Sequence, residues 1–304
     1  MADIKIQETN QPIANTNSLA RLIMEDILRY LRLKRRNLLR KLLALVGKGP
    51  STWLAEILAR YEKRIIETSF LQASREALSL FSDGIQLHGQ ENIPTEGGLL
   101  VVANHPGLAD ALGALVSVGR ENVTIVAGKR DILRALPNLR RYFLELETEI
   151  NLRANATREI IRLLSQNKTV IIFPRGALEP EPSLVGGTLE SLTEWSRSIG
   201  IFLAKVPDTH LVPMLISRVL TEKAWNSWIA RRFKTLKRRH QMAMVVQFVM
   251  QRLSKNPIWK IPIRIDVGEV QTAREIDPDL DPKNLAESAK SRVAALLQTA
   301  YPSE

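Results

Sequence analysis

A histidine and an aspartate, His105 and Asp110, give the clearest chemical signal in this 304-residue chain. They lie in the stretch NHPGLAD, residues 104–110, which directly follows the apolar run Leu99–Ala103. A carboxylate that hydrogen-bonds one ring nitrogen of a histidine fixes the tautomer and leaves the other nitrogen as a general base. Because the chain has no cysteine and no serine in a G-x-S-x-G setting, the pair is expected to deprotonate a substrate hydroxyl. The structural alternative is a loop-capping histidine beside a first-turn acid of a helix.

Basic residues follow the other apolar runs and are candidates for binding anions. Arginine suits this role because it stays charged and binds phosphate through two parallel hydrogen bonds. The alternative for each is a solvated surface arginine, paired with an acid such as Asp131 or Glu179. The candidates are Lys129 and Arg130 after residues 123–127, Arg153 after residues 145–150, and Arg175 after residues 169–173.

These residues share one rim if the apolar runs form a parallel sheet. From residue 85 onward, short apolar runs alternate with helical patterns, which predicts an α/β domain with a mostly parallel central sheet flanked by helices. Ligands bind at the carboxyl ends of such strands, where all the candidate residues stand. Strands are expected at 85–88, 99–103, 123–127, 145–150, 169–173 and 211–216, with an edge strand at 261–267. After the strand at 99–103, a helix is expected that ends at about residue 118. Further helices are expected at 133–143, 154–166, 189–200, 222–253 and 285–299.

The first third of the chain has helical patterns and no strand pattern. Apolar spacing predicts one helix from residue 19 to about 46, ending at the stretch GKGP (47–50), and further helix from 51 to about 81. We therefore expect residues 1–84 to form an N-terminal helical hairpin or bundle, and residues 85–304 to form the α/β domain. Residues 1–17 are polar and are expected to be disordered.

Composition narrows the classes of partner and of site. The chain has 43 Lys+Arg against 32 Asp+Glu, a net charge of +11, so nucleic acid, an anionic membrane or phosphorylated small molecules are the expected partners. The lack of cysteine excludes disulfides, cysteine-ligated zinc and iron–sulfur clusters. No apolar run reaches the roughly 18–20 residues of a spanning helix, and no signal peptide is visible, so a cytoplasmic location is expected.

Five blocks of the chain resemble, in their order, those of the glycerolipid acyltransferase family, whose members acylate glycerol-3-phosphate and lysophosphatidic acid. NHPGLAD resembles the family's N-H-x4-D motif, and AGKR (127–130) resembles its second block. NLR (151–153) is similar to the arginine-bearing segment, IIFPRG (171–176) to the F-P-E-G block, and LVPM (211–214) to the V-P-V/I block. The resemblance spans about residues 85–220 and extends weakly to 270.

The resemblance implies an enzyme of phospholipid biosynthesis. It would move a fatty acyl group from coenzyme A or acyl carrier protein to a hydroxyl of glycerol-3-phosphate, lysophosphatidic acid or a related lipid. His105 would be the general base, Asp110 its orienting partner, and backbone N–H groups would stabilise the oxyanion. Neither a metal nor a bound cofactor is implied. The acceptor's phosphate would be bound by Arg130 and Arg153, with Lys129 and Arg175 in support, and the site would be lined by Asn104, Gly107, Pro174, Gly176 and Pro213.

The third block departs from the family pattern. It reads FPRGALE where the family usually reads F-P-E-G-T-R-S, so Arg175 replaces the acidic residue that helps to hold the acceptor. Ala177 and Leu178 replace a threonine and a phosphate-binding arginine. Three readings follow: Arg175 supplies the lost cation, Glu179 restores a carboxylate, or the acceptor differs from the usual two.

Two basic stretches lie outside these blocks. Residues 29–41 hold seven Lys/Arg and no acid, a composition that suits an acidic carrier protein or an anionic membrane. Residues 223–239 place Trp225, Trp228 and Phe233 at helical spacing among cations, which is typical of helices at the surface of an anionic bilayer. We therefore expect peripheral contact with the membrane. The alternative is a helix that packs on the core and presents a solvated basic face.

Two other functions are open at this point. A family member without catalytic activity would bind lipid or acyl donor, and the altered FPRG block fits that reading. A nucleic-acid-binding protein would use the same positive charge, but the chain has no nucleic-acid-binding motif and only 5% aromatic residues. No nucleic-acid partner is therefore expected.

Overall fold

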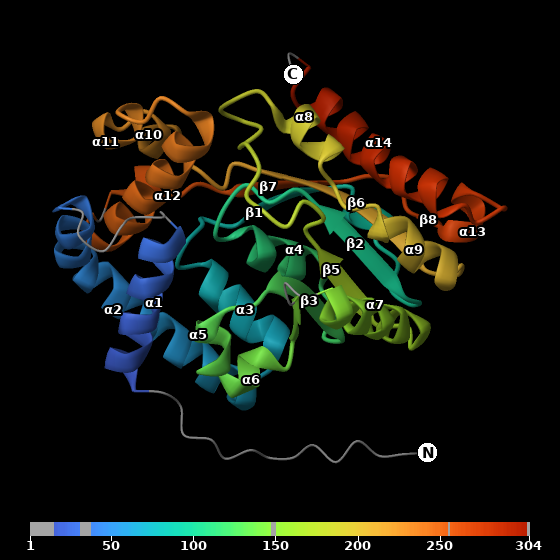
Figure 1. Cartoon of the computed structure of the whole chain (residues 1–304), viewed down its shortest axis with the longest axis horizontal. Helices are drawn as coiled ribbons and strands as arrows, with labels where there is room; N and C mark the ends of the chain where they lie inside the picture. Colours follow the sequence, from blue (N-terminus) through green and yellow to red (C-terminus); the bar gives the residue numbers. More distant parts are fainter. Residues whose placement is uncertain (1–14, 31–37, 147–149, 255, 303–304) are drawn as a thin grey trace.

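The centre of the protein is an eight-stranded sheet in the computed structural model, which describes residues 15–30, 38–146, 150–254 and 256–302 (Figure 1). Its order is β1-β7-β6-β2-β5-β3-β4, and β8 pairs with β6. Among the described strands, all pairs are parallel except β6 with β7 and with β8. This confirms the predicted α/β class with a mostly parallel central sheet. The strands are β1 (Ile85–His88), β2 (Leu99–Ala103), β3 (Val123–Gly128), β4 (Phe143–Leu146), β5 (Thr169–Ile172), β6 (His210–Ser217), β7 (Ile263–Val267) and β8 (Gln271–Thr272).

Helices cover both faces of this sheet. One core joins it to α1–α6, and a second core joins it to α7, α8, α9, α13 and α14 (Figure 1). The helices on the first face are α1 (Thr16–Tyr30), α2 (Leu38–Glu67), α3 (Phe70–Leu78), α4 (Asp110–Val118), α5 (Asp131–Arg134) and α6 (Pro137–Arg140). Those on the second are α7 (Ile150–Ser165), α8 (Thr188–Thr193), α9 (Ser198–Lys205), α13 (Ala273–Ile276) and α14 (Pro282–Ala300).

Strand β2 shows why the centre of the sheet is rigid. All of its residues are buried, and it pairs with β5 on one side and β6 on the other. Its side chains alternate between the two cores, with Val101 in the first and Leu100 and Val102 in the second. Because both faces are covered, the strand reads as a continuous apolar run. The loop that follows β2 therefore leaves from the most enclosed part of the fold.

The N-terminal helices share a core with the sheet. Leu19 of α1, Tyr61 of α2 and Phe70 of α3 belong to the same hydrophobic cluster as Val101 of β2. The predicted helix end at GKGP is wrong, because α2 continues through Pro50. The predicted disorder over 1–17 is also wrong at its end, because α1 begins at Thr16, while residues 1–14 lie outside the described residues.

A third, smaller hydrophobic cluster lies beside the first core and is built from the segment between β6 and β7. Here the single helix expected over 222–253 is wrong, because the side chains of Thr221 and Ser227 each accept a backbone N–H and start new helices. The cluster encloses Trp225, Ala230 and Trp259. The elements are α10 (Glu222–Trp225), α11 (Trp228–Arg231), α12 (Leu236–Leu253) and the 3-10 turn Pro257–Trp259.

Three further expectations differ from the structure. The strand 261–267 is not at an edge, because β7 lies between β1 and β6; its polar residues Arg264 and Asp266 pair with each other instead of facing water. The helix expected over 133–143 is two short helices, with Pro137 starting α6. The stretch 151–153 belongs to α7 and is not a loop after a strand.

Candidate active site

His105 and Asp110 are in direct contact at the carboxyl end of β2. The Nδ1–H of His105 donates to Oδ2 of Asp110 at 2.7 Å. The aspartate is fully buried and also accepts the backbone N–H groups of Gly107 at 2.8 Å and Ala111 at 2.7 Å. Because Asp110 is the first residue of α4, its carboxylate also faces the positive end of that helix. The arrangement orients the imidazole, which is 30% exposed, and leaves Nε2 as the ring nitrogen that could accept a proton.

The loop that carries His105 is held by segments far away in the sequence. Asn104 is fully buried, and its side chain donates to the carbonyl of Ile216 at 2.8 Å and accepts the Ile216 N–H at 2.7 Å. The backbone of His105 exchanges two bonds with Glu179: its N–H donates to the Glu179 carboxylate at 3.2 Å, and its carbonyl accepts the Glu179 N–H at 2.8 Å. Both contacts fix the backbone on either side of the catalytic imidazole.

A second histidine braces the same loop from α12. The Nε2–H of His240 donates to the carbonyl of Pro106 at 2.8 Å, and its ring stands edge-on to Trp225. Burial lowers the pKa of His240, which keeps the ring neutral and suits a single donated proton. The sequence analysis gave His240 no role. The only signal available there was a lone histidine at the start of a largely apolar helix.

Opposing effects set the pKa of His105. Burial by itself lowers the pKa, but the charge and hydrogen bond of Asp110 and the charge of Glu179 outweigh it, so the pKa is raised above 6.5. The charge of Arg130 acts in the opposite direction and lowers the pKa of His105. A raised pKa makes the imidazole a stronger base toward a hydroxyl proton.

Arg130 is the basic candidate that the structure brings near His105. It precedes α5 and is exposed, and its charge opposes the rise that burial causes in the pKa of Asp26 on α1. Arg130 thus lies within electrostatic range of both α1 and the catalytic loop. Lys129 is exposed beside it at the end of β3. Arg153 belongs to α7, and its side chain lies outside the described residues.

Arg175 is committed to contacts within the protein. Its guanidinium donates through two nitrogens to the carboxylate of Glu194, at 3.1 and 2.9 Å, and through the third to the carbonyl of Leu178 at 2.6 Å. It therefore braces the loop that follows β5. Pro174 and Gly176 lie in the same turn, where Gly176 takes a φ of 68°, a conformation that favours glycine.

Glu179 is buried and does not face solvent. Besides His105, its carboxylate accepts hydrogen bonds from Ser191 at 2.7 Å and from the indole of Trp195 at 3.1 Å. Burial raises its pKa, while these bonds and the charge of Arg175 oppose that rise. Glu181 is also fully buried and accepts the N–H groups of residues 218, 219 and 220, which follow β6. The stretch LEPEP, residues 178–182, places both glutamates next to prolines, and this is the sequence feature from which their structural role could have been suspected.

Pro213 is buried within β6, opposite Val102, and so lies in the sheet instead of at its rim. Gly107, in contrast, stands in the catalytic loop, close against Val219: a Cβ built on Gly107 would be 2.5 Å from Val219 Cγ1. The ring of Phe173 lies 4.8 Å from that of His105 and forms one wall beside the imidazole.

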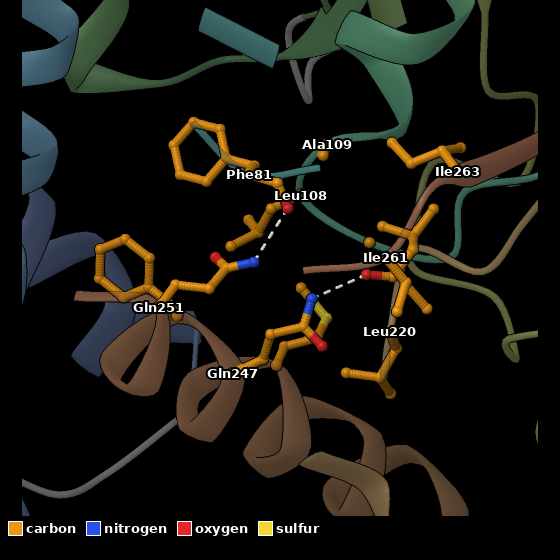
Figure 2. Close-up of a pocket in the computed structure, with 12 residues that line it drawn as sticks. Phe81, Leu108, Ala109, Leu220, Gln247, Gln251, Ile261 and Ile263 are labelled. Atoms are coloured by element: carbon orange, nitrogen blue, oxygen red, sulfur yellow. Dashed lines mark hydrogen bonds between the residues drawn. The ribbon is translucent and has the colours of Figure 1, made fainter. Parts of the chain in front are cut away.

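A small apolar pocket begins next to this loop (Figure 2). Its cavity volume is about 30 Å³, enough for one water molecule but not for an acyl chain without movement of the walls. Gln251 donates to the carbonyl of Phe81, and Gln247 donates to that of Val219, so α12 is tied across the pocket (Figure 2). The lining residues are Phe81, Gly107, Leu108, Ala109, Val219, Leu220, Met244, Gln247, Phe248, Gln251, Ile261 and Ile263.

The described residues contain no group of three or more His, Cys, Asp or Glu that could hold a metal ion. Among the same residues, no helix combines the length and the apolar character needed to cross a bilayer.

Two comparisons with known proteins found similarities. Residues 84–217 match the family model described as Acyltransferase. The crystal structure of the 1-acyl-sn-glycerophosphate (LPA) acyltransferase PlsC from Thermotoga maritima is similar to this chain, with 18% sequence identity and a TM-score of 0.46, over 94% of this chain and 92% of that one. None of the curated proteins matches the chain.

Proposed function

From the match of residues 84–217 to the acyltransferase family model, we propose that this chain is a glycerolipid O-acyltransferase. The proposed donor is a fatty acyl thioester of coenzyme A or acyl carrier protein. The proposed acceptor is a hydroxyl of glycerol-3-phosphate, lysophosphatidic acid or a related lysolipid. The observation that carries the proposal is the contact of His105 with buried Asp110 at the end of a central strand, inside the matched segment.

In the proposed mechanism, Nε2 of His105 takes the proton of the acceptor hydroxyl as its oxygen attacks the thioester carbonyl. Asp110 holds the imidazolium that forms through the 2.7 Å bond to Nδ1. The tetrahedral oxyanion collapses, the carbon–sulfur bond breaks, and the imidazolium returns its proton to the leaving thiolate. The products are the ester and the free thiol, and His105 is neutral again.

The acceptor's phosphate is assigned first to Arg130. Its charge reaches His105, whereas the guanidinium of Arg175 is already paired with Glu194 and Leu178. Lys129 and Arg153 stay as proposed supporting cations. In this proposal Arg175 does not replace the lost cation of the third block, and buried Glu179 does not replace its carboxylate. Both residues instead hold the catalytic loop in place.

The acyl chain is assigned to the apolar pocket. The pocket begins at residues 107–109, which follow His105 in the same loop, and most of its lining is apolar. A chain can enter only when α12 moves away from the opposite wall, because the present volume is too small. Since both the acyl chain and the product are lipids, the proposal includes a cytoplasmic enzyme in peripheral contact with a membrane.

The test is acyl transfer from labelled acyl-coenzyme A and acyl carrier protein to a panel of glycerol-3-phosphate, lysophosphatidic acid and other lysolipids. His105→Ala should lower the rate by about 10²-fold or more, because the general base is lost. His88→Ala is the matched control, since His88 also bonds an aspartate through Nδ1 but stands at the end of β1. We expect this variant to keep wild-type activity.

Two outcomes would contradict the proposal. If the wild type transfers to no acceptor yet binds the acyl donor, the chain is a binding protein without activity. If His105→Ala and His88→Ala lose activity equally, the loss reflects altered folding and not the removal of a base.

A further inference from the structure

One tryptophan of this protein stands apart from the others. Trp228, at the start of α11, is 72% exposed, whereas Trp195, Trp225 and Trp259 are buried. Tryptophan is seldom left in water at this level, because its ring loses a large apolar contact area. The third cluster beneath it is already filled by Trp225, Ala230 and Trp259. Trp228 is therefore not part of the hydrophobic cluster that packs its own segment.

A second exposed apolar side chain, Leu236, stands at the start of α12. It is 46% exposed and follows Trp228 by eight residues in the sequence. Four exposed cations lie in or next to this stretch of sequence, and with Trp228 and Leu236 they form what we call the basic corner. The cations of the basic corner are Arg231, Arg232, Lys234 and Lys237.

The charge around the basic corner is strongly one-sided. Residues 222–239 hold seven basic side chains and one acidic one, Glu222. The guanidinium of Arg232 lies 6.0 Å from the centre of the Trp228 ring. From the neighbouring elements, Glu194 is the acid within range, because the charge of Lys237 lowers its pKa. That carboxylate is already paired with Arg175, so it does not cancel the excess.

We propose that the basic corner docks on the surface of an anionic lipid bilayer. An exposed indole and an exposed leucine within one exposed basic segment suit the interface of such a bilayer, where apolar side chains enter the headgroup region and cations meet lipid phosphates. An acidic protein would need the cations but would leave Trp228 without a defined partner. Single-stranded nucleic acid would need several stacking aromatics, and Trp228 is the one fully exposed ring among the described residues.

The position of the basic corner connects it to the catalytic loop. It lies on α11 and the first turn of α12 (Figure 1), and His240, one turn further along α12, bonds Pro106. The same helix continues as the wall of the apolar pocket through Met244 and Phe248. A bilayer bound at the basic corner would therefore contact the first turn of α12, the helix that also lines the pocket.

The experiment measures binding of the full chain to vesicles, with no acyl donor present, so it is independent of the proposed reaction. We expect the wild type to bind phosphatidylglycerol vesicles and to bind phosphatidylcholine vesicles at least about tenfold more weakly. Lys234→Glu with Lys237→Glu should lower the partition coefficient about tenfold or more, and Trp228→Ala about tenfold. Trp228→Phe should keep most of the binding and lose the shift of tryptophan emission on vesicle addition.

Matched controls separate the basic corner from charge and apolarity in general. Lys205→Glu with Lys283→Glu makes the same change in net charge on the far side of the molecule, at the end of α9 and the start of α14 (Figure 1), and should leave binding nearly unchanged. Ile66→Ala removes an apolar side chain that is 67% exposed on α2 and should also leave binding unchanged. Thermal unfolding of each variant checks that it folds.

The proposal is overturned if folded variants of the basic corner bind anionic vesicles as tightly as the wild type. It is also overturned if the wild type ignores vesicles but binds acyl carrier protein through Trp228 and Lys237, which would make this surface a protein interface. Acyl-transfer activity does not enter either outcome.

Discussion

Neighbouring charges of opposite sign shift the pKa of His105 in opposite directions. As the proposed general base, His105 must be neutral, so activity should fall as the pH drops through its pKa, which is raised above 6.5. Asp110→Asn removes the charge that raises this pKa and should move the acidic limb of the kcat/KM profile to lower pH. Arg130→Gln removes a charge that lowers it and should move the limb to higher pH. The measurement is kcat/KM between about pH 5 and 9.

The two variants should also differ in the size of their effects. Asp110→Asn loses the carboxylate that orients Nδ1, so kcat should fall by about 10²-fold or more at every pH. Arg130→Gln should mainly raise the KM of a phosphorylated acceptor. If the acidic limbs of the Asp110→Asn and Arg130→Gln profiles shift in the same direction, the group that titrates in this limb is not His105.

At the residue scale, a contact between residues close in the sequence could be predicted, whereas contacts between distant residues could not. His105 and Asp110 were predicted to touch, and they do, because a strand end followed by a helix start brings residues five apart together. The contact of Arg175 with Glu194 was not predicted. It depends on a loop path of nineteen residues that no local pattern describes. Glu179 was considered as a residue that contacts the acceptor. Its burial, which argues against that role, is a property of the folded loop and cannot be seen in the sequence.

At the scale of elements, the packing of the loop after β2 against the loop after β6 should affect kcat. The loop after β2 and the loop after β6 touch where Gly107 meets Val219. Gly107→Ala would place a Cβ 2.5 Å from a short, branched side chain, so the loop that carries His105 must shift. We expect kcat to fall at least about tenfold, because small displacements of a base are costly. Adding Val219→Ala should restore part of that loss, and steady-state kinetics of the three variants checks this.

A matched pair of outcomes decides this prediction. Val219→Ala alone should be close to wild type in kcat, since it removes contact without creating a clash. Gly107→Ala activity equal to wild type, or a double variant no better than the single one, would show that the two loops do not constrain each other.

Strands were easier to predict than helices, for a physical reason. Buried parallel strands such as β2 and β5 are continuous apolar runs and can be seen without knowing their neighbours. Helix ends depend on local competition. Pro50 stays inside α2, although prolines usually mark helix ends. The reverse happens at Ser227, where a side-chain cap starts a new helix within a continuous helical pattern.

Glu62 tests whether the whole molecule unfolds as one unit. This fully buried residue of α2 accepts the N–H groups of Asn138 at 2.6 Å and Leu139 at 2.9 Å, at the start of α6. Glu62→Ala leaves the buried N–H of Leu139 and the half-buried N–H of Asn138 without this partner and should lower the free energy of unfolding by about 2–4 kcal/mol. Because the N-terminal helices share the first core with the sheet, we expect calorimetry to show one transition at lower temperature.

Glu67→Ala is the control on the same helix, since Glu67 forms exposed ion pairs with Lys63 and Arg64. We expect no measurable change in its unfolding midpoint. Two separate transitions in Glu62→Ala, with only the first one shifted, would instead make residues 15–84 an independent domain.

The order of the strands could not be predicted from the sequence. Apolar runs identify strands, but nothing in them says that β6 lies beside β2 or that β7 runs antiparallel to it. That choice follows from which helices can cover which face, a property of the assembled chain.

The braces of the catalytic loop also determine when the site forms as a ribosome makes the chain. Asn104 is held by a partner 112 residues later, and Pro106 by one 134 residues later. The histidine and aspartate leave the ribosome long before the strand and the helix that hold their loop. A nascent chain that ends before residue 210 contains the whole catalytic motif but neither brace. The geometry of this site should therefore form late and abruptly during synthesis, after the strand and the helix that hold the loop have been made.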